Sequence, residues 1–378
     1  MKILIYDNKV VGHHLEYLHH WYSEACLNSN EFFFLVNKDF DQVKDKFHWE
    51  KTNNIKFIFL NDEEQKISEG ENLLKCAWRM SFVIRKYVKE FQIDRVWLVM
   101  FMELMPFLPF FLPKGVLVSG IVYSIYLYNK MKFRGLRLVL ENLRYAIISK
   151  HFNVERIYIL NDSEMTLLLN EKFKSRKFKY LPDPVPDIDK DKLSLIRKVF
   201  PINSDDKVYL HFGAMDYRKG TIELLKAINM LPEKIAQNKF FIFAGKVSSN
   251  MREEFYEVLK NNKNHSRIKV FDEFCSYEFL NNLCLSCDAI MIPYKSAAQS
   301  SGVVGYASFF KKPVIGPAFA MIGKIIKKYS LGLVLDEITP ESIKNALCLQ
   351  LPSVSNEYYE EHNVDSFNRI IFESIDSN

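Results

Sequence analysis

The sequence predicts an α/β protein with two parallel sheets, each wound with helices on both faces. Short apolar runs alternate with longer segments of helical period through both halves of the 378-residue chain. Three prolines, at positions 182, 184 and 186, separate the halves, and proline neither continues a helix nor sits in a central strand. We therefore expect two doubly wound domains that are joined near this segment.

The order of the elements follows from this alternation. In the first half, strands are expected at 2–6, 31–36, 55–60, 94–100, 115–121 and 156–160, and helices at 13–27, 71–91, 135–151 and 163–172. In the second half, strands are expected at 207–212, 239–245, 267–271, 288–293, 313–317 and 332–335, with helices between them. The last segment, 355–376, has the pattern of an amphipathic helix.

Composition places the chain among ordinary globular proteins. Its residues are 48% hydrophobic and 26% charged, and its net charge of +5 suits anionic ligands or an acidic membrane surface. That charge is too small to indicate nucleic-acid binding. The first strand is interrupted by a charge before a signal-peptide core forms, and the prolines of Leu104–Pro113 exclude a spanning helix. With six cysteines in no framework spacing, we expect a cytoplasmic protein.

Two segments of the second half have the residues that phosphate groups need. The turn after the strand at 207–212 contains Gly213 and is followed by Arg218 and Lys219, and Ser300 to Gly302 precede a predicted helix. Glycine lets the backbone approach a ligand closely, and the first N–H groups of a helix point at an anion. Two such devices in one α/β unit predict a diphosphate ligand, and therefore a nucleotide or nucleotide-sugar.

These segments resemble the donor-site motifs of family 4 nucleotide-sugar glycosyltransferases. Gly213 to Gly220, followed by Leu224-Leu225-Lys226-Ala227, is similar to the family's "glycine … Arg-Lys-Gly … Leu-Leu-x-Ala" signature. Residues 288–294, 300–307 and 312–316 match the family's donor-site strand, phosphate loop and following strand, in the same order. The resemblance covers residues 205–335.

The resemblance implies the GT-B architecture, in which two doubly wound Rossmann-like domains face each other across a cleft. We expect an acceptor-side domain at 1–182 and a donor-binding domain at 183–354, with a final helix, 355–378, that crosses back to the first domain. Ligands of such sheets bind beyond the carboxyl ends of the strands, so the cleft is the expected site.

For the donor, the resemblance implies that Arg218 and Lys219 hold the diphosphate and stabilise its developing charge without a metal or other cofactor. A solvated pair of cations is the alternative, although helix starts favour anions. The other donor contacts are expected from Gly213, Phe274, Gln299, Ser300, Ser301, Gly302 and Tyr306. The alternatives are an ordinary N-cap for the serines and a core position for Phe274.

The sequence departs from the family at one point. Typical members carry two glutamates ahead of the strand that begins with Lys312-Pro313-Val314, and alignment on that strand puts Ala298 and Tyr306 at their positions. Gln299 and Tyr306 can still form hydrogen bonds with hydroxyl groups, but neither is a carboxylate. The departure leaves open both the identity of the donor sugar and whether the protein catalyses sugar transfer.

On the acceptor side, Gly12, His13 and His14 follow the first strand directly. The glycine resembles the family's loop near the donor phosphate and the acceptor, and either histidine can hold a hydroxyl group or act as an acid or base. The neighbouring Glu16, His19 and His20 allow a metal site as an alternative, and surface histidines are another.

A possible membrane contact is the apolar run at 104–113. It precedes three tyrosines and four cations, which are Tyr123, Tyr126, Tyr128, Lys130, Lys132, Arg134 and Arg137. Aromatic and cationic residues beside an apolar patch suit the headgroups of an anionic leaflet. A buried loop and a solvated helix start form the alternative.

Together these features predict a retaining, metal-independent glycosyltransferase. Its donor would be a nucleotide-sugar, and its acceptor a glycan or lipid-linked glycan of surface polysaccharide or lipopolysaccharide synthesis. Two alternatives remain, a sugar-nucleotide-binding subunit without turnover and a nucleotide-sugar 2-epimerase. The epimerase needs positioned acid/base carboxylates, and the sequence shows no obvious set of them.

Overall fold

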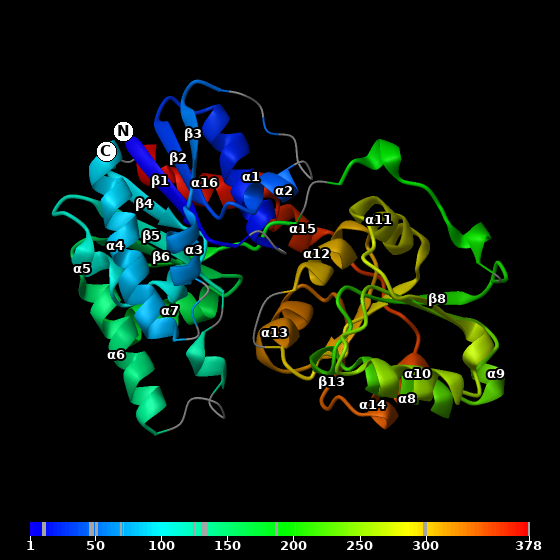
Figure 1. Ribbon diagram of the computed structural model, residues 1–378. Coiled ribbons are helices and arrows are strands. Elements are labelled where there is room, and N and C mark those ends of the chain that lie inside the picture. Colours follow the sequence, from blue (N-terminus) through cyan, green and yellow to red (C-terminus); the bar gives the residue numbers. More distant parts are fainter. Residues whose placement is uncertain are drawn as a thin grey trace. The chain divides into compact units, whose positions relative to one another are not determined.

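The computed structural model describes residues 1–9, 13–44, 49, 52–68, 70, 72–123, 125–129, 135–185, 188–200, 202–297 and 301–376. The chain forms two compact units (Figure 1). The first unit contains residues 1–182 and the C-terminal residues from 364 onward, and the second contains residues 183–363.

The first unit is built on a seven-stranded parallel sheet in the order β3-β2-β1-β4-β5-β6-β7. Its strands are β1 (Lys2–Asp7), β2 (Glu31–Val36), β3 (Ile55–Phe59), β4 (Arg95–Leu98), β5 (Leu117–Val122), β6 (Val154–Leu160) and β7 (Phe178–Leu181). Its helices are α1 (His13–Cys26), α2 (Phe40–Val43), α3 (Asp62–Ser68), α4 (Leu73–Phe91), α5 (Leu108–Phe111), α6 (Leu136–Lys150), α7 (Ser163–Phe173) and α16 (Val364–Asp376). Strand β7 was not predicted; it lies at the edge of the sheet, where the prolines that follow it remove no ladder hydrogen bond.

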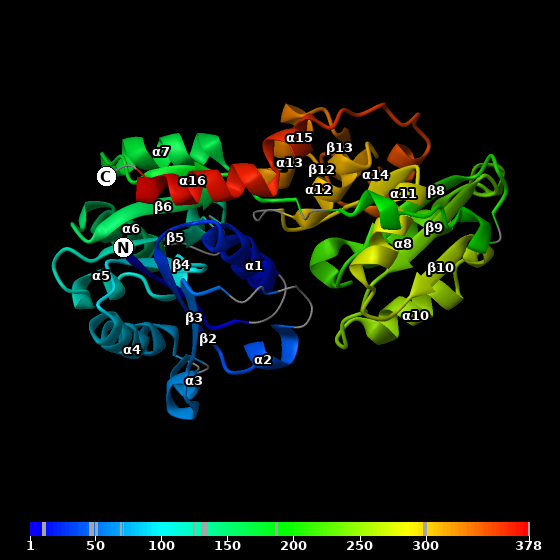
Figure 2. The same cartoon turned by 90° about the horizontal axis from the view of Figure 1, so that it is seen from above.

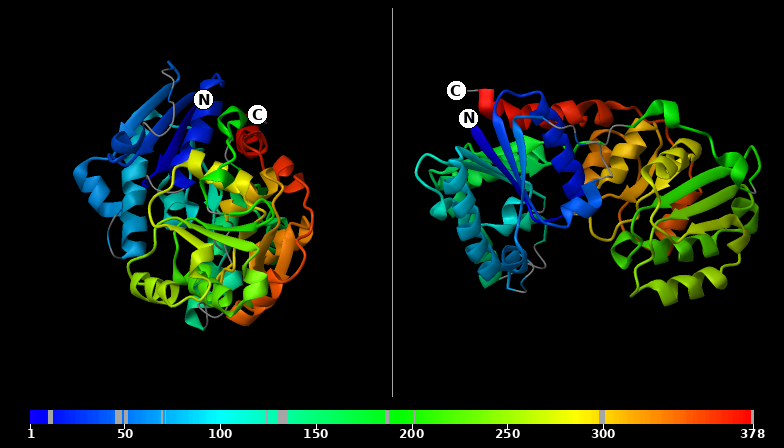
Figure 3. Two further views of the ribbon diagram at one scale, coloured as in Figure 1. Left: turned by 90° about the vertical axis from the view of Figure 1, so that its right-hand side faces the viewer. Right: turned by 45° about the horizontal axis from the view of Figure 1, so that its top comes forward.

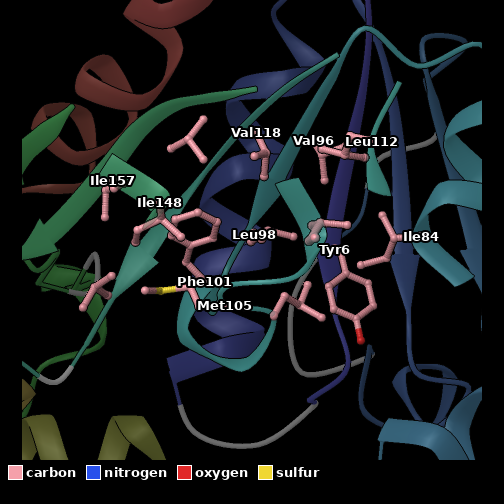
Figure 4. Packing of buried hydrophobic residues seen from close by; sticks show 14 of the residues in the cluster. Tyr6, Ile84, Val96, Leu98, Phe101, Met105, Leu112, Val118, Ile148 and Ile157 are labelled. Carbon is pink, nitrogen blue, oxygen red and sulfur yellow. The ribbon is translucent and has the colours of Figure 1, made fainter. Parts of the chain in front are cut away.

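The central strand β1 is apolar on both faces because helices cover both. On β1, Leu4 and Tyr6 pack with α4, α6 and α7, whereas Ile3 and Ile5 pack with α1 and α16. Figure 4 shows the first of these faces, where Leu98 and Phe101 lie among the side chains of the core. Figure 2 shows that the last helix, in red, lies within the first unit.

The apolar run at 104–113 belongs largely to this core. Leu104, Met105 and Leu108 are buried, while Phe110 is exposed. Pro109 lies in the first turn of the short helix α5, and Pro106 and Pro113 lie outside the helices. Among the described residues, the structure contains no helix that is both long and apolar enough to span a bilayer.

The second unit contains a six-stranded parallel sheet in the order β10-β9-β8-β11-β12-β13. Its strands are β8 (Lys207–Phe212), β9 (Lys239–Ala244), β10 (Ile268–Phe271), β11 (Ala289–Met291), β12 (Val314–Pro317) and β13 (Gly332–Leu335). Its helices are α8 (Thr221–Met230), α9 (Glu233–Ala236), α10 (Arg252–Lys260), α11 (Tyr277–Ser286), α12 (Gly302–Phe309), α13 (Ala320–Lys328), α14 (Pro340–Leu347) and α15 (Glu357–Glu361). The right-hand view of Figure 3 shows its green strands side by side, with helices of the same unit beneath them.

The single helix expected at 355–376 is in fact two helices in different units. Helix α15 packs on α12, where the rings of Tyr359 and Phe309 lie 4.8 Å apart and Tyr359 N donates to Ser308 Oγ (3.0 Å). Residues 355–363 therefore lie in the second unit, and only α16 returns to the first.

Both sheets have the same winding. In each, the first strand lies in the middle, the next two strands extend to one side and the later strands to the other. The order reverses between β1 and β4 in the first unit and between β8 and β11 in the second. Doubly wound sheets bind ligands at such a reversal, beyond the carboxyl ends of the strands.

Candidate functional site

In the second unit, the loop at the reversal is shaped by three glycines. Gly213 (φ +93°) and Gly220 (φ +66°) adopt backbone angles that disfavour other residues. A Cβ on Gly220 would lie 2.0 Å from the Pro293 carbonyl oxygen, and one on Gly245 would lie 2.1 Å from that of Gly213. The loop that follows β8 therefore packs closely against the residues that directly follow β9 and β11.

The side chains beneath this loop hold it in place. Asp216 Oδ1 accepts a hydrogen bond from Lys219 N (2.9 Å) and so starts a 3₁₀ turn, Tyr217–Lys219. His211 donates from Nδ1 to the Met291 carbonyl (2.9 Å) and accepts at Nε2 from the Thr221 hydroxyl (3.0 Å). Burial lowers the pKa of His211 to about 4. This histidine is therefore neutral, and its two hydrogen bonds connect β8 with β11 and α8.

Arg218 and Lys219 lie together above the loop. The Arg218 guanidinium carbon is 5.7 Å and the Lys219 ammonium nitrogen 5.5 Å from the centre of the Tyr294 ring. The same ammonium lies 2.6 Å from where a Cβ of Gly213 would be. Arg218 is 3.7 Å from Asp216, whereas Lys219 forms no ion pair with any residue that the structure describes. Its charge is therefore available to an anion at the glycine turn.

The phosphate loop is only partly within the described residues. Gln299 and Ser300, like Ala298, lie outside them. Ser301 stands at the N-cap of α12 and Gly302 begins the helix, and the Ser301 side chain makes no capping hydrogen bond. The N–H groups of this helix start can therefore bind an anion, but the donor contacts of the loop stay predictions.

Two further predicted donor residues have contrasting surroundings. Phe274 is 79% exposed, so the structure excludes a core position for it. Tyr306 is only 7% exposed, and its ring packs edge-on against Phe212 at 5.7 Å. Phe274 is thus accessible to a flat ligand such as a base, whereas most of Tyr306 is part of the interior of the second unit.

At the same place in the first unit, the structure reveals an acid that the sequence analysis missed. Asp7 closes β1 and is almost fully buried, and its Oδ2 accepts a hydrogen bond from His14 Nδ1 (2.8 Å). Burial raises the pKa of Asp7, although its bond with His14 opposes the shift. Because Nδ1 donates, Nε2 of a neutral His14 is the acceptor nitrogen. An acidic residue at the end of an apolar strand was the available signal.

The other residues of this loop give less information. Gly12 and the side chain of His13 lie outside the described residues. Glu16 and His20 are buried, and desolvation lowers the pKa of His20 to about 4. Within the described ranges, no group of three or more histidine, cysteine or acidic residues has an arrangement that could hold a metal.

The residues that were predicted to face a membrane differ in their exposure, and some lie outside the described residues. Tyr126 is buried, and Arg137 is exposed near the start of α6. Lys130, Lys132, Arg134 and the side chain of Tyr128 lie outside the described residues. The contact with an anionic membrane therefore stays a prediction.

Comparison with known proteins agrees with the resemblance in the second unit. Residues 194–351 match the family described as glycosyl transferases group 1. A search of curated proteins found no match.

Solved structures show the fold of the whole chain. The chain is similar to WaaG, a glycosyltransferase involved in lipopolysaccharide biosynthesis, with 14% identity and a TM-score of 0.63 over 100% of this chain and 96% of WaaG. It is similar to HepE of Anabaena, solved with UDP and glucose, with 12% identity and a TM-score of 0.69 over 100% of both chains. For sucrose-phosphate synthase of Thermosynechococcus elongatus, the identity is 12% and the TM-score 0.71 over 100% of this chain and 98% of the synthase. These similarities confirm the expected α/β fold of the GT-B class.

Proposed function

From the group 1 glycosyltransferase match and the GT-B fold, we propose that this protein is a retaining glycosyltransferase that uses a nucleotide-sugar donor. Its acceptor is a glycan or lipid-linked glycan of surface polysaccharide or lipopolysaccharide synthesis. The observation that carries the proposal is the position of Lys219, which lies over the Gly213 turn beside Arg218 and forms no ion pair with any described residue.

These cations suit the chemistry of sugar transfer. When the bond between the sugar and the phosphate breaks, negative charge develops on the departing nucleoside diphosphate. A guanidinium fork and an ammonium group, fixed in place by Tyr294 and by the loop, stabilise that charge more in the transition state than in the ground state. We propose that they replace a metal ion in this role.

In the first unit, His14 is proposed to bind the acceptor. Its Nε2 can accept the hydrogen of the attacking hydroxyl group while Asp7 holds the ring in position. The ring of Tyr123, stacked at 6.0 Å, restrains the imidazole further.

A thermal-shift screen with UDP-, GDP-, ADP- and CMP-sugars tests the donor class. Ligand at one hundred times its dissociation constant should add about 2.7 kcal/mol to the apparent stability. Transfer or donor hydrolysis with the best ligand should then persist in excess EDTA. If EDTA abolishes turnover and magnesium or manganese restores it, the metal-independent mechanism is wrong.

One observation favours a second candidate, a subunit that binds sugar nucleotide without turnover. Tyr306, at the position of a family glutamate, places a largely buried ring there and no carboxylate. The same screen separates the two functions, since the subunit would show the thermal shift but neither transfer nor hydrolysis with any acceptor extract.

A further inference from the structure

The first unit contains a deep apolar groove of about 700 Å³ between α4 and α6. This volume is within the range of about 300–1,000 Å³ that is typical of small-molecule sites. The walls include five leucine and three methionine side chains from the two helices and from the segment that follows β4. Polar atoms contribute little to the lining, so the groove suits an apolar ligand.

The groove is open along one side and reaches the core at its floor. Along the rim, Leu73 and Leu74 on α4 and Leu140 and Leu143 on α6 are exposed. At the floor, Ala77, Met80 and Met105 are buried. Figure 4 shows Met105 below Leu98 and Phe101, within the core. Exposed leucines beside a deep channel are unfavourable in water unless a ligand covers them.

This depth indicates what can fill the groove. A bilayer surface or the face of another protein would cover the rim leucines but would not fill the space of about 700 Å³ between the two helices. A single hydrocarbon chain is thin enough to enter, and each methylene that it buries adds about 0.8 kcal/mol. Unbranched methionine side chains can adjust to such a chain.

One end of the groove lies beside the proposed acceptor residues. Tyr6 and Asn8, on either side of Asp7 at the end of β1, are part of its lining. Helices α4 and α6 both begin at this carboxyl edge of the sheet, because each follows a parallel strand.

Side chains alternate along a strand, so Tyr6 faces the groove while Asp7 faces α1 and His14. Lys9 connects the two sides, because its ammonium pairs with Glu103 of the lining and its N–H donates to Asp7 Oδ1 (3.0 Å). A ligand in the groove can present its head to His14 across this edge of the sheet.

The charges of the lining favour an anionic head. Glu103 pairs with Lys9, and Glu141 accepts from Arg144 Nη1 (2.6 Å), so both acids are neutralised. Arg144 Nη2 also donates to the carbonyls of Met102 and Met105, both at 3.1 Å. Arg137 is exposed and, among the described residues, has no ion-pair partner. It is the lining residue that can meet a phosphate.

We propose that this groove binds the hydrocarbon chain of an anionic lipid-linked acceptor, with its phosphate near Arg137 and its sugar near His14. The inference rests on the proposed glycosyltransferase function and names the acceptor class. Binding of the chain itself requires neither donor nor turnover.

Calorimetric titration of the full-length protein with decyl phosphate, below its micelle concentration, tests the groove. Leu140→Asp should weaken binding about tenfold or more, because it places a charge among the apolar walls. The matched control is Leu168→Asp on α7, outside the groove, since Leu140 and Leu168 are 48% and 47% exposed. Equal affinities of the two variants, or no binding by the wild type, would overturn the proposal.

The head group is tested with a second pair of ligands. Arg137→Gln should weaken the binding of decyl phosphate about tenfold or more, as expected for one charge-assisted hydrogen bond, and leave the binding of the neutral decyl glucoside unchanged. Inorganic phosphate at the same concentration should not displace decyl phosphate from the groove. A variant that binds both amphiphiles as the wild type does would remove Arg137 from the site.

Two other occupants of the groove give different results. If Leu140→Asp detaches the protein from anionic vesicles while decyl phosphate never binds, the rim contacts a bilayer and the proposal is wrong. If the wild type is a dimer that Leu140→Asp makes monomeric, a second copy covers the groove and the proposal is equally wrong.

A last measurement separates this inference from the proposed function. The groove of Lys219→Ala should bind decyl phosphate with wild-type affinity because Lys219 is not part of its lining. If the wild type binds decyl phosphate but no donor, the proposed glycosyltransferase function is wrong and the groove is still a lipid-binding site. Donor turnover without decyl phosphate binding would do the reverse.

Discussion

The first strand-to-helix turns of the two sheets occupy the same topological position but carry opposite chemistry. After β8, the second unit presents two cations over a glycine turn, and its histidine, His211, is a neutral strut inside the strand. After β1, the first unit presents a buried acid bonded to a histidine of the next helix. The reversal in strand order determines where each unit can bind a ligand, whereas a few loop residues determine which ligand it binds.

This difference predicts that the two loops bind different substrates, which experiments on variants of each loop can test. Variants of the second loop should change the affinity for the nucleotide, and variants of the first should change transfer to the acceptor alone. The same residue type, histidine, should act as a site residue in one unit and as a support in the other.

The largest effect is expected for Lys219→Ala. Loss of this ammonium should lower the rate of donor turnover about a hundredfold or more, because it removes one electrostatic stabiliser of the leaving diphosphate. Arg218→Ala should act in the same direction. Steady-state kinetics on purified variants measure the effect, and an unchanged melting temperature shows that the fold is kept.

The matched control for these variants is Lys226→Ala on α8. Lys226 is a surface cation whose partner is Glu254 (3.1 Å), so its removal should leave turnover unchanged. Near-wild-type activity of both Arg218→Ala and Lys219→Ala would contradict the diphosphate assignment and remove the contrast between the loops.

Acidification should reveal the supporting role of His211. Its pKa is about 4 in the folded protein, below the ordinary value of about 6.5, so the unfolded chain binds the extra proton first. The contribution of His211 to stability is present above pH 6.5 and is lost as the pH falls toward 4, by on the order of 2 kcal/mol at pH 5. Urea unfolding at pH 7 and pH 5 should show a smaller loss for His211→Gln than for the wild type.

His20 and His362 should add to the same loss, since burial also lowers the pKa of each to about 4. The wild type should therefore lose more stability than His211 alone explains. An identical pH dependence of wild type and His211→Gln would show that His211 is not held neutral.

The smallest of the three effects is expected for Asp7→Asn. Because Asp7 acts through His14, this substitution should lower kcat for transfer about tenfold while the dissociation constant of the donor stays the same. In a His14→Ala background, Asp7→Asn should have almost no further effect, as expected for two residues that act as one unit. Additive losses in the double variant, or a weakened donor, would contradict the division between the two loops.

Sequence patterns were sufficient where a local rule governs the outcome. Twelve strand segments were predicted at or near their observed positions, since alternation of buried strands and amphipathic helices depends on neighbours along the chain. The Gly213 turn and its two cations were also found, because glycine and charge at a strand end are visible in a short window. Strand β7 was missed because it is only four residues long and runs directly into the proline-rich connection.

Other features depended on contacts between distant segments. Asp7 became part of a site only when the fold placed its oxygen against His14, and the break between α15 and α16 arose because α15 found a partner in α12. Tyr306 aligned with a ligand-binding position, yet its ring packs on Phe212 of β8.

The sequence by itself determined the fold class, the order of the elements and the cationic turn of the second unit. Only the tertiary structure decided the Asp7–His14 pair and the apolar groove. The physical reason is that periodicity reports which face of a helix is apolar, but not whether a neighbour covers it. On α4 and α6 the apolar faces continue past the core, and the open groove between them exists because no other described segment fills it.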